Sequence, residues 1–150
     1  MCRRILAAVG WTSNADAVLD QTRRLAELSG AQVHVLRVQP MDSVIRPSPL
    51  GMLSDALAEV SGATAGQPPA EQSLDDSVAV LVAADIHAKG TLVETPPGNT
   101  AFAVLQHAGH QQAELIVIGC GQSARPSAPS CSTVACQIVQ HAACPVLIVP

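Results

Sequence analysis

The stretch RILAAVGWTSNADAVLDQTRRLAELSGAQVHVLRV, residues 4–38, decides the fold. It opens and closes on short apolar runs, at 4–9 and 31–38, that are typical of strands buried on both faces. Between them, apolar residues recur at helical spacing, which predicts a helix with one face on a sheet. Ser13 and Asp16 have the spacing of a capping box at its start. The stretch therefore predicts two parallel strands joined by a helical crossover.

The same alternation continues to the end of the chain. Apolar runs at 91–95, 114–119 and 144–149 predict three further strands, with helical patterns before each of them. One of these helices is expected to start near Ser73 and to end at Gly90. Strands and helices in alternation predict an α/β, doubly wound, Rossmann-like fold: a five-stranded parallel sheet with helices on both faces. Right-handed crossovers favour the strand order 3-2-1-4-5.

One region interrupts the alternation. Residues 39–71 are rich in Pro, Gly and Ser, and a single short helix is expected there, at 50–60. With 150 residues and 48% hydrophobic content, the chain has the apolar mass of one ordinary domain. We therefore expect one domain over residues 1–150, with an irregular segment near its middle.

Composition limits the partners. The net charge is -4, the pI is about 5.6 and only 1% of residues are aromatic, so nucleic acid is not an expected partner. No apolar run reaches the roughly 18 residues of a membrane span, and the run after the first arginines is too short for a signal peptide. The five cysteines are scattered, which fits reduced thiols. We expect a cytoplasmic protein that does not enter a membrane.

The predicted strand order points to a place for a ligand. In this order the first and fourth strands lie side by side where the crossovers reverse, and ligands bind in the crevice at their carboxyl ends. Gly10 follows the first strand, and GCGQSARPSAPSCST, residues 119–133, follows the fourth. A glycine-bearing loop that leads into a helix can hold phosphate, because backbone amides and the helix N-terminus attract anions.

Several segments together resemble the universal stress protein family in their order and spacing. The matching segments are RILAAVGWTS (4–13), VLRV (35–38), GNTAFAVL (98–105), ELIVIG (114–119) and HAACPVLIV (141–149). The resemblance covers nearly the whole chain and is weakest in residues 39–71. It implies a five-stranded parallel α/β domain with a cytoplasmic role in stress or dormancy.

The resemblance also implies how ATP would be bound. ATP-binding members carry, after the fourth strand, Gly, two residues, Gly, nine residues, Gly, and then Ser or Thr. Here Gly119 matches the first glycine and Thr133 matches the final hydroxyl residue. Gln122 and Ser132 stand where the second and third glycines belong. A side chain costs about 1–2 kcal/mol wherever a loop needs left-handed backbone, so both replacements weaken a phosphate site.

Two further positions complete the implied nucleotide site. The acidic residue that ATP-binding members place after the first strand falls on Gly10, whereas Val38 matches the apolar residue that packs beside adenine. With the acid and two glycines missing, we expect no tightly bound cofactor and no tightly bound ATP. The alternative is an adenine nucleotide held by the altered loop 119–133.

The last strand is an expected interface. An apolar strand at a sheet edge invites pairing, and the resemblance implies a homodimer joined there. The residues expected at this interface are Val146, Leu147, Ile148 and Val149. A protein client is also expected, without any feature that identifies it.

A Cys/His zinc site or a thiol redox module is an alternative of a different class. Cys120, Cys131, Cys136, His141 and Cys144 gather in the last third of the chain, but no CxxC pair is present. Cys136 is expected to be a small buried residue within a helix, and Cys131 is the better candidate for a thiolate. Since no catalytic motif is present either, we assign no catalytic and no metal-binding residues.

Overall fold

The computed structural model describes residues 2–10, 14–40, 70–96, 98–120 and 133–150. Within these ranges five parallel strands form one sheet in the order β3-β2-β1-β4-β5, which confirms the predicted fold class and strand order. The strands are β1 (Arg4–Val9), β2 (Gln32–Pro40), β3 (Ala88–Thr95), β4 (Leu115–Gly119) and β5 (Val146–Val149).

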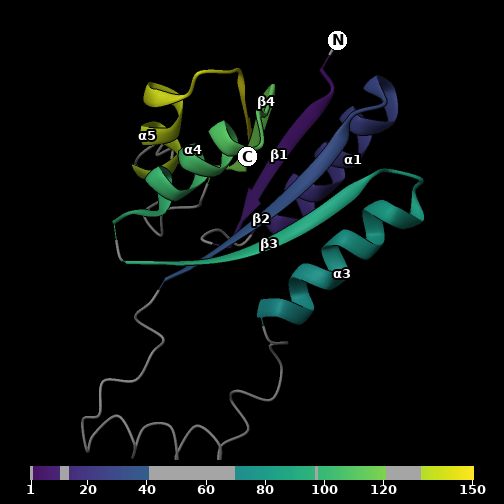
Figure 1. Ribbon diagram of the computed structural model, residues 1–150, viewed down its shortest axis with the longest axis horizontal. Coiled ribbons are helices and arrows are strands. Elements are labelled where there is room, and N and C mark those ends of the chain that lie inside the picture. The colour runs from purple at the N-terminus through teal and green to yellow at the C-terminus, as the bar shows by residue number, and fades with distance from the viewer. Residues whose placement is uncertain (1, 11–13, 41–69, 97, 121–132) are drawn as a thin grey trace, which may run out of the picture.

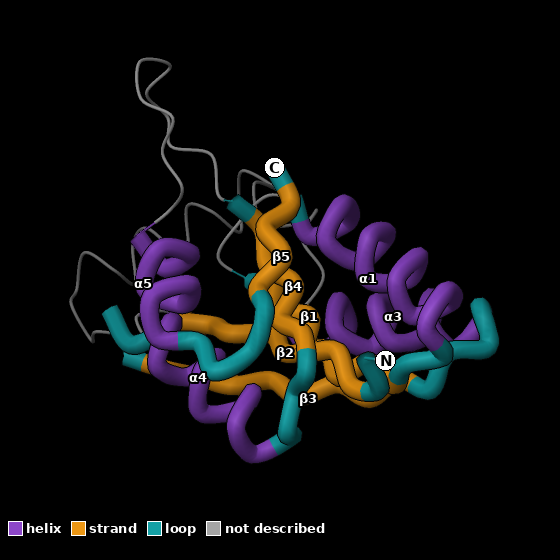
Figure 2. Tube along the Cα trace, turned by 90° about the horizontal axis from the view of Figure 1, so that it is seen from above, coloured by secondary structure: helices purple, strands orange, loops and turns teal. Residues whose placement is uncertain are grey.

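Helices cover both faces of the sheet. They are α1 (Ala15–Ser29), α3 (Ala70–Ala83), α4 (Thr100–His110) and α5 (Thr133–His141). Figure 2 shows α1 and α3 on one side of the strands and α4 and α5 on the other, and Figure 1 shows β3 at one edge. This division follows from right-handed crossovers, since the chain moves outward from β1 in one direction and later in the other. None of the helices described is long and apolar enough to cross a membrane.

Strand β1 supplies both layers of the core, because alternate residues of a strand point to opposite faces. Ile5, Ala7 and Val9 are buried with residues of α1 and α3. Leu6 and Ala8 are buried with residues of α4 and α5. The strand is thus apolar along almost its whole length, as the run of hydrophobic residues predicted.

The start of α1 differs in part from the prediction. Asn14 is the N-cap residue, and Ser13, which was expected to cap the helix, lies outside the described residues. The Asn14 side chain makes no capping hydrogen bond; its Nδ2 donates instead to the carbonyl of Val149, 2.9 Å away. At the other end Gly30 has φ of 69° and its N–H donates to Ala26 O. A left-handed C-terminal glycine is what the sequence predicted there.

The predicted boundary between α3 and β3 is wrong. The helix ends at Ala83, a turn follows in which Asp85 has φ of 59°, and the strand begins at Ala88 rather than at 91. Gly90 therefore lies inside the strand instead of ending the helix. Its role is in packing, because a Cβ on Gly90 would lie 2.9 Å from Val78 Cγ2 and 3.0 Å from Leu74 Cγ.

The start of α3 also differs from the expected capping box. Helix α3 begins at Ala70, so Ser73 lies within its first turns and does not cap it. Its hydroxyl accepts a hydrogen bond from the Arg37 guanidinium, at 3.2 Å. The segment expected to be irregular, 39–71, overlaps regular structure at both ends, since β2 runs to Pro40 and α3 begins at Ala70. The short helix expected at 50–60 lies outside the described residues.

We predict that Gly90→Val and Leu74→Ala compensate each other. Gly90→Val crowds the buried Leu74 side chain and should lower the free energy of unfolding by about 1–3 kcal/mol. Leu74→Ala should lower it by about 2–5 kcal/mol, because it leaves a cavity. In the double variant the valine fills part of that cavity. Urea unfolding should therefore show a loss of unfolding free energy at least about 0.5 kcal/mol smaller than the sum of the losses in the two single variants. Strict additivity would show that Gly90 and Leu74 do not pack together.

Candidate functional site

The predicted site residues Gly10 and Gly119 come to the same end of the sheet. Strands β1 and β4 are neighbours in parallel register, with Ala8 paired to Ile118. Gly10 directly follows β1, and the buried Gly119 is the last residue of β4. The next helices, α1 and α5, lie on opposite faces, so the crossovers diverge at this point. This is the switch point at which a doubly wound sheet binds its ligands (Figure 2).

Gly10 lies against the backbone of Val38, another of the predicted site residues. Gly10 has φ of 122°, a value that residues with a side chain rarely adopt. A Cβ built on it would lie 2.3 Å from Val38 O and 3.1 Å from Val38 N. Val38 is 2% exposed and is held in β2, whose neighbouring residue Arg37 pairs with Val9. Any side chain at Gly10, acidic or not, would therefore require the backbone at Gly10 or at Val38 to shift.

On the other side of the switch point, one carbonyl joins three elements. The Val149 carbonyl at the end of β5 accepts hydrogen bonds from Asn14 Nδ2, at 2.9 Å, and from Cys120 N, at 2.8 Å. Gly119 pairs with Val149 in the sheet. The start of α1 is thereby fastened to the ends of β4 and β5.

Asn14 is the residue of this region that the sequence reasoning missed. Its Oδ1 is buried and accepts no hydrogen bond within the described residues. A buried amide oxygen without a donor is costly, which marks this as a polar position at the ligand-binding end of the sheet. The only signal in the sequence was an asparagine just before a helical pattern, and the capping argument assigned that role to Ser13.

Of the loop that was expected to hold phosphate, residues 119–133, the structure describes Gly119, Cys120 and Thr133. Gln122 and Ser132 lie outside the described residues. Thr133, the expected hydroxyl residue, is the exposed first residue of α5. Gly10, Val38 and Gly119 are thus the predicted site residues whose surroundings the structure describes.

The cysteine and histidine residues do not form a site in the described part of the chain. There, no group of three or more His, Cys, Asp or Glu side chains could hold a metal ion. Burial raises the pKa of the Cys144 thiol, and the nearby Cys2 raises it further, so this thiol stays protonated near neutral pH. Cys136 is exposed on α5, and the expectation that it is buried was wrong. Cys131 lies outside the described residues.

The last strand forms an edge of the sheet, next to β4. Val149 is buried in the layer of α1 and α3, whereas Val146 and Ile148 pack partly against the layer of α4 and α5. Leu147 is the most exposed large hydrophobic of the strand, at 36%. Of the four residues expected at a dimer interface, Leu147 is the most exposed, Val146 and Ile148 are half-buried and Val149 is buried.

Comparison with known families identifies the family to which this chain belongs. A sequence profile described as the universal stress protein family matches residues 1–150. The chain belongs to the universal stress protein family. A search of curated proteins finds no match to the chain.

Solved universal stress proteins share the fold over almost their full length. A family member from Burkholderia pseudomallei is 26% identical, with 98% of this chain and 95% of that chain covered and a TM-score of 0.67. The universal stress protein UspA from Lactobacillus plantarum is 19% identical, with 99% and 97% covered and a TM-score of 0.70. A universal stress protein from Archaeoglobus fulgidus, solved in complex with dAMP, is 17% identical, with 100% and 98% covered and a TM-score of 0.64.

We predict that replacing each of three glycines by alanine changes the free energy of unfolding by an amount that depends on the surroundings of the new methyl group. Gly10→Ala combines backbone strain with overlap on Val38 and should lower the free energy of unfolding by about 2–4 kcal/mol. Gly30→Ala has the left-handed backbone but no described atom within 4 Å of the new methyl, so it should cost only about 1 kcal/mol. Gly109→Ala, in an open position of α4, should gain up to about 1 kcal/mol.

Denaturant unfolding of these three variants measures the ranking. Equal effects of Gly10→Ala and Gly30→Ala would show that the contact with Val38 adds nothing to the backbone strain.

Proposed function

We propose that this universal stress protein does not hold ATP tightly and acts in a cytoplasmic stress or dormancy response as a homodimer that contacts a protein partner. The observation that carries the proposal is the contact between Gly10 and the Val38 carbonyl. ATP-binding members of the family place an acidic side chain at the position of Gly10. In this chain that position lacks the carboxylate, and a Cβ built on the present backbone would overlap the Val38 carbonyl.

The sequence of the loop after β4 supports the same conclusion. Gln122 and Ser132 replace two glycines of the ATP motif, and Pro126 and Pro129 remove two backbone amide donors. If each replaced glycine costs about 1–2 kcal/mol, each lowers the affinity for a triphosphate by about tenfold. Both the nucleoside side and the phosphate side of the site are thus weakened.

The alternative is that an adenine nucleotide binds in an altered manner. Solved universal stress proteins of the same fold include one in complex with dAMP and one in complex with cAMP. In this chain Asn14 Oδ1, at the switch point, has no donor among the residues that the structure describes, and the N-terminus of α1 lies beside it. A monophosphate would need fewer contacts from the loop than a triphosphate, so dAMP and cAMP belong in the binding test.

We predict that titration calorimetry of the full chain detects no micromolar site for MgATP. We expect the same result, no micromolar binding, for dAMP and for cAMP. Micromolar binding of any of the three at one site per chain would contradict the proposal. The matched variant is Gln122→Gly with Ser132→Gly, which restores the loop glycines but leaves the contact between Gly10 and Val38. Its affinity for ATP should remain weaker than micromolar. If the variant binds ATP in the micromolar range, the loop alone explains the weak binding and Gly10 does not contribute.

Gly10→Asp would be a poor way to restore the site. The variant restores the family's acidic side chain, but its Cβ would overlap the Val38 carbonyl. We expect it to lose stability as Gly10→Ala does, so it cannot report on nucleotide affinity in an unchanged fold.

We predict that the protein is a dimer at micromolar concentration and that Leu147→Lys makes it monomeric. The lysine would place a charge on the exposed apolar side chain of the edge strand β5. Size-exclusion chromatography with light scattering measures the mass directly. Leu28→Lys is the control, because Leu28 on α1 is 84% exposed and lies away from β5 in the sequence and fold. A monomeric wild-type protein, or an equal effect of the control, would contradict pairing through β5.

A further inference from the structure

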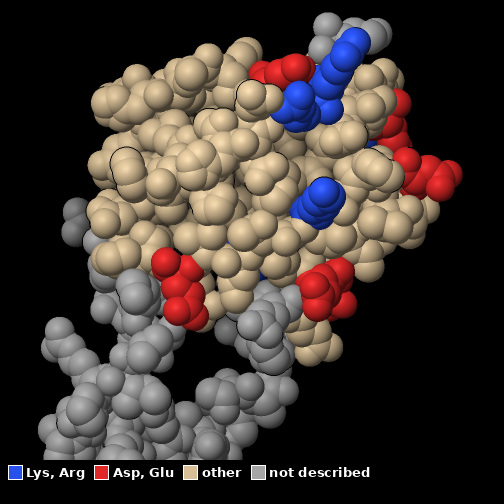
Figure 3. All heavy atoms as spheres, viewed as in Figure 1, with Lys and Arg blue, Asp and Glu red and all other residues tan. Residues whose placement is uncertain are grey.

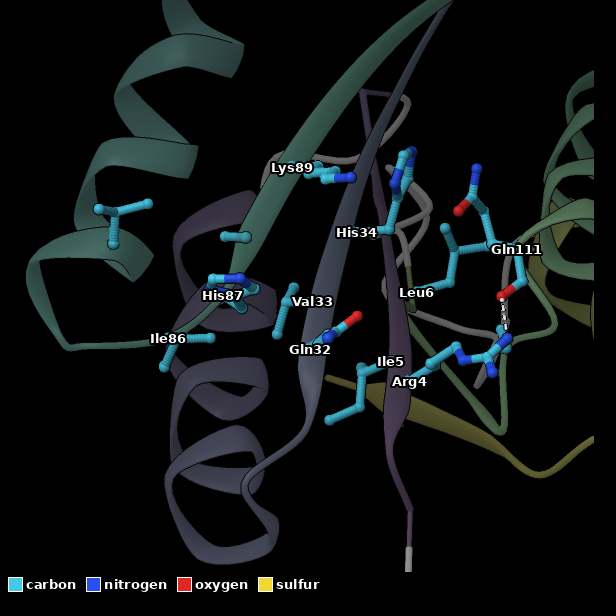
Figure 4. A pocket seen from close by; sticks show the side chains of 13 residues that line it. Arg4, Ile5, Leu6, Gln32, Val33, His34, Ile86, His87, Lys89 and Gln111 are labelled. Carbon is cyan, nitrogen blue, oxygen red and sulfur yellow. Dashed lines mark hydrogen bonds between the residues drawn. The ribbon is translucent and has the colours of Figure 1, made fainter.

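A cavity of about 400 Å³ lies at the opposite end of the sheet from the switch point. The first residues of β1, β2 and β3 line it together with the turn between α4 and β4 (Figure 4). Its polar lining residues include Arg4, Gln32, His34, His87, Lys89 and Gln111. The volume is in the range of sites for small organic molecules.

The polar strand residues of the lining share one face of the sheet, whereas Ile5, Val33 and Ile86, which also line the cavity, belong to the opposite layer. His34 precedes the buried Leu36 by two residues, and Arg4 precedes Leu6 by two, so both point to the face that carries α4 and α5. Lys89 pairs with His34 in the register between β2 and β3. Leu6 and Ala113 give the cavity an apolar part between the polar groups. The arrangement offers charged groups around an apolar floor.

The cavity is basic, although the chain as a whole carries a net charge of -4. Arg4 and Lys89 line it, and no Asp or Glu does. Figure 3 shows Lys and Arg atoms over a largely neutral surface, with one group of Asp or Glu atoms directly beside the upper Lys and Arg atoms and the other acidic groups toward the margin. A positive site on an acidic protein is a local feature that favours anions.

No described carboxylate forms an ion pair with either cation of the cavity. All the ion pairs of the described residues lie on α1, where Arg23 and Arg24 contact Asp20 and Glu27. Arg4 Nη1 donates to Gln112 Oε1, at 2.6 Å, and to the carbonyl of Gln111, at 3.4 Å, and both acceptors are neutral. These bonds hold the guanidinium at the cavity without cancelling its charge (Figure 4). Glu114, next to Arg4 in the sheet, accepts instead from the backbone N–H of Arg3.

His34 adds a neutral hydrogen-bonding group between the two cations. Its Nε2 lies 2.9 Å from Thr91 Oγ1. Burial lowers the pKa of His34, and the nearby His107 and Lys89 lower it further. The imidazole is therefore uncharged near neutral pH and lies in an excess of positive charge that a bound anion would relieve.

We propose that this cavity binds a small organic anion, with an apolar body on Leu6 and Ala113 and one carboxylate or phosphate group between Arg4 and Lys89. The two cations start from strands separated by β2, roughly 10 Å apart, and both side chains are long enough to reach an anion between them. The Arg fork matches carboxylate and phosphate oxygens alike. This site is distant from Gly10 and Gly119, so it does not depend on the proposed function.

The test uses phenyl phosphate and benzoate as probes on the full-length protein. Lys89 is the only lysine of the sequence, so reductive methylation with ¹³C places an NMR label at the cavity and otherwise only at the N-terminus. We expect a saturable shift of the Lys89 signal with at least one probe at concentrations up to about 10 mM, which corresponds to weak but specific binding. Benzyl alcohol, which is neutral, should cause no such shift. Inorganic phosphate, which lacks the apolar body, should bind at least about fivefold more weakly than phenyl phosphate.

Variants assign the binding to the cavity. Binding of the unmethylated variants is followed by calorimetry, and Arg4→Gln and Lys89→Met should each weaken it at least about fivefold. Arg24→Gln removes the same charge from the exposed surface of α1 and should leave the affinity unchanged. Circular dichroism checks that all three variants keep the fold. The proposal is overturned if neither probe binds, if Arg24→Gln weakens binding as much as the cavity variants do, or if benzyl alcohol or inorganic phosphate binds as well as phenyl phosphate.

Discussion

Parallel pairing of β1 with β2 on one side and β4 on the other is the constraint on which the rest of the structure depends. It places β1 at the centre of the sheet and buries almost all of its residues. It also places the crossover from β1 to β2 and the crossover from β3 to β4 on opposite faces, which creates the switch point. The residue that directly follows β1 therefore lies at the place where a ligand would bind. In this chain that residue is Gly10, whose backbone lies against β2.

That contact connects the packing of the sheet with the proposed loss of tight ATP binding. Gly10 has positive φ and lies against the Val38 carbonyl of β2, at the position where the resemblance places the acid of ATP-binding members. A side chain at this position would overlap the Val38 carbonyl as the backbone stands. On the far side of the switch point, Asn14 and Cys120 share the Val149 carbonyl and fasten α1 to β5. The opposite end of the sheet keeps an open basic cavity, which gives this fold a second place for a ligand.

Local patterns predicted the fold well, because strand burial and helix amphipathicity follow from the order of apolar and polar residues within one segment. The limits of β1 and the left-handed Gly30 agree with the sequence for this reason. Gly90 was misread as a helix end because its packing against Leu74 and Val78 depends on how α3 lies on β3. The resemblance assigned the acidic position to Gly10, but the contact of Gly10 with Val38 depends on tertiary structure and could not be predicted from the sequence. The basic cavity could not be predicted, since its residues come from separate segments with no motif of their own.

The most direct test of the account is amide NMR of the ¹⁵N-labelled protein during titration with MgATP, read at Gly10, Val38 and Gly119. The account predicts that these amides show no saturable shift in the micromolar range of ATP, while the rest of the spectrum confirms a folded protein. Saturable shifts of these amides at micromolar ATP would show that the switch point holds the nucleotide despite the contact between Gly10 and Val38, and would contradict the account.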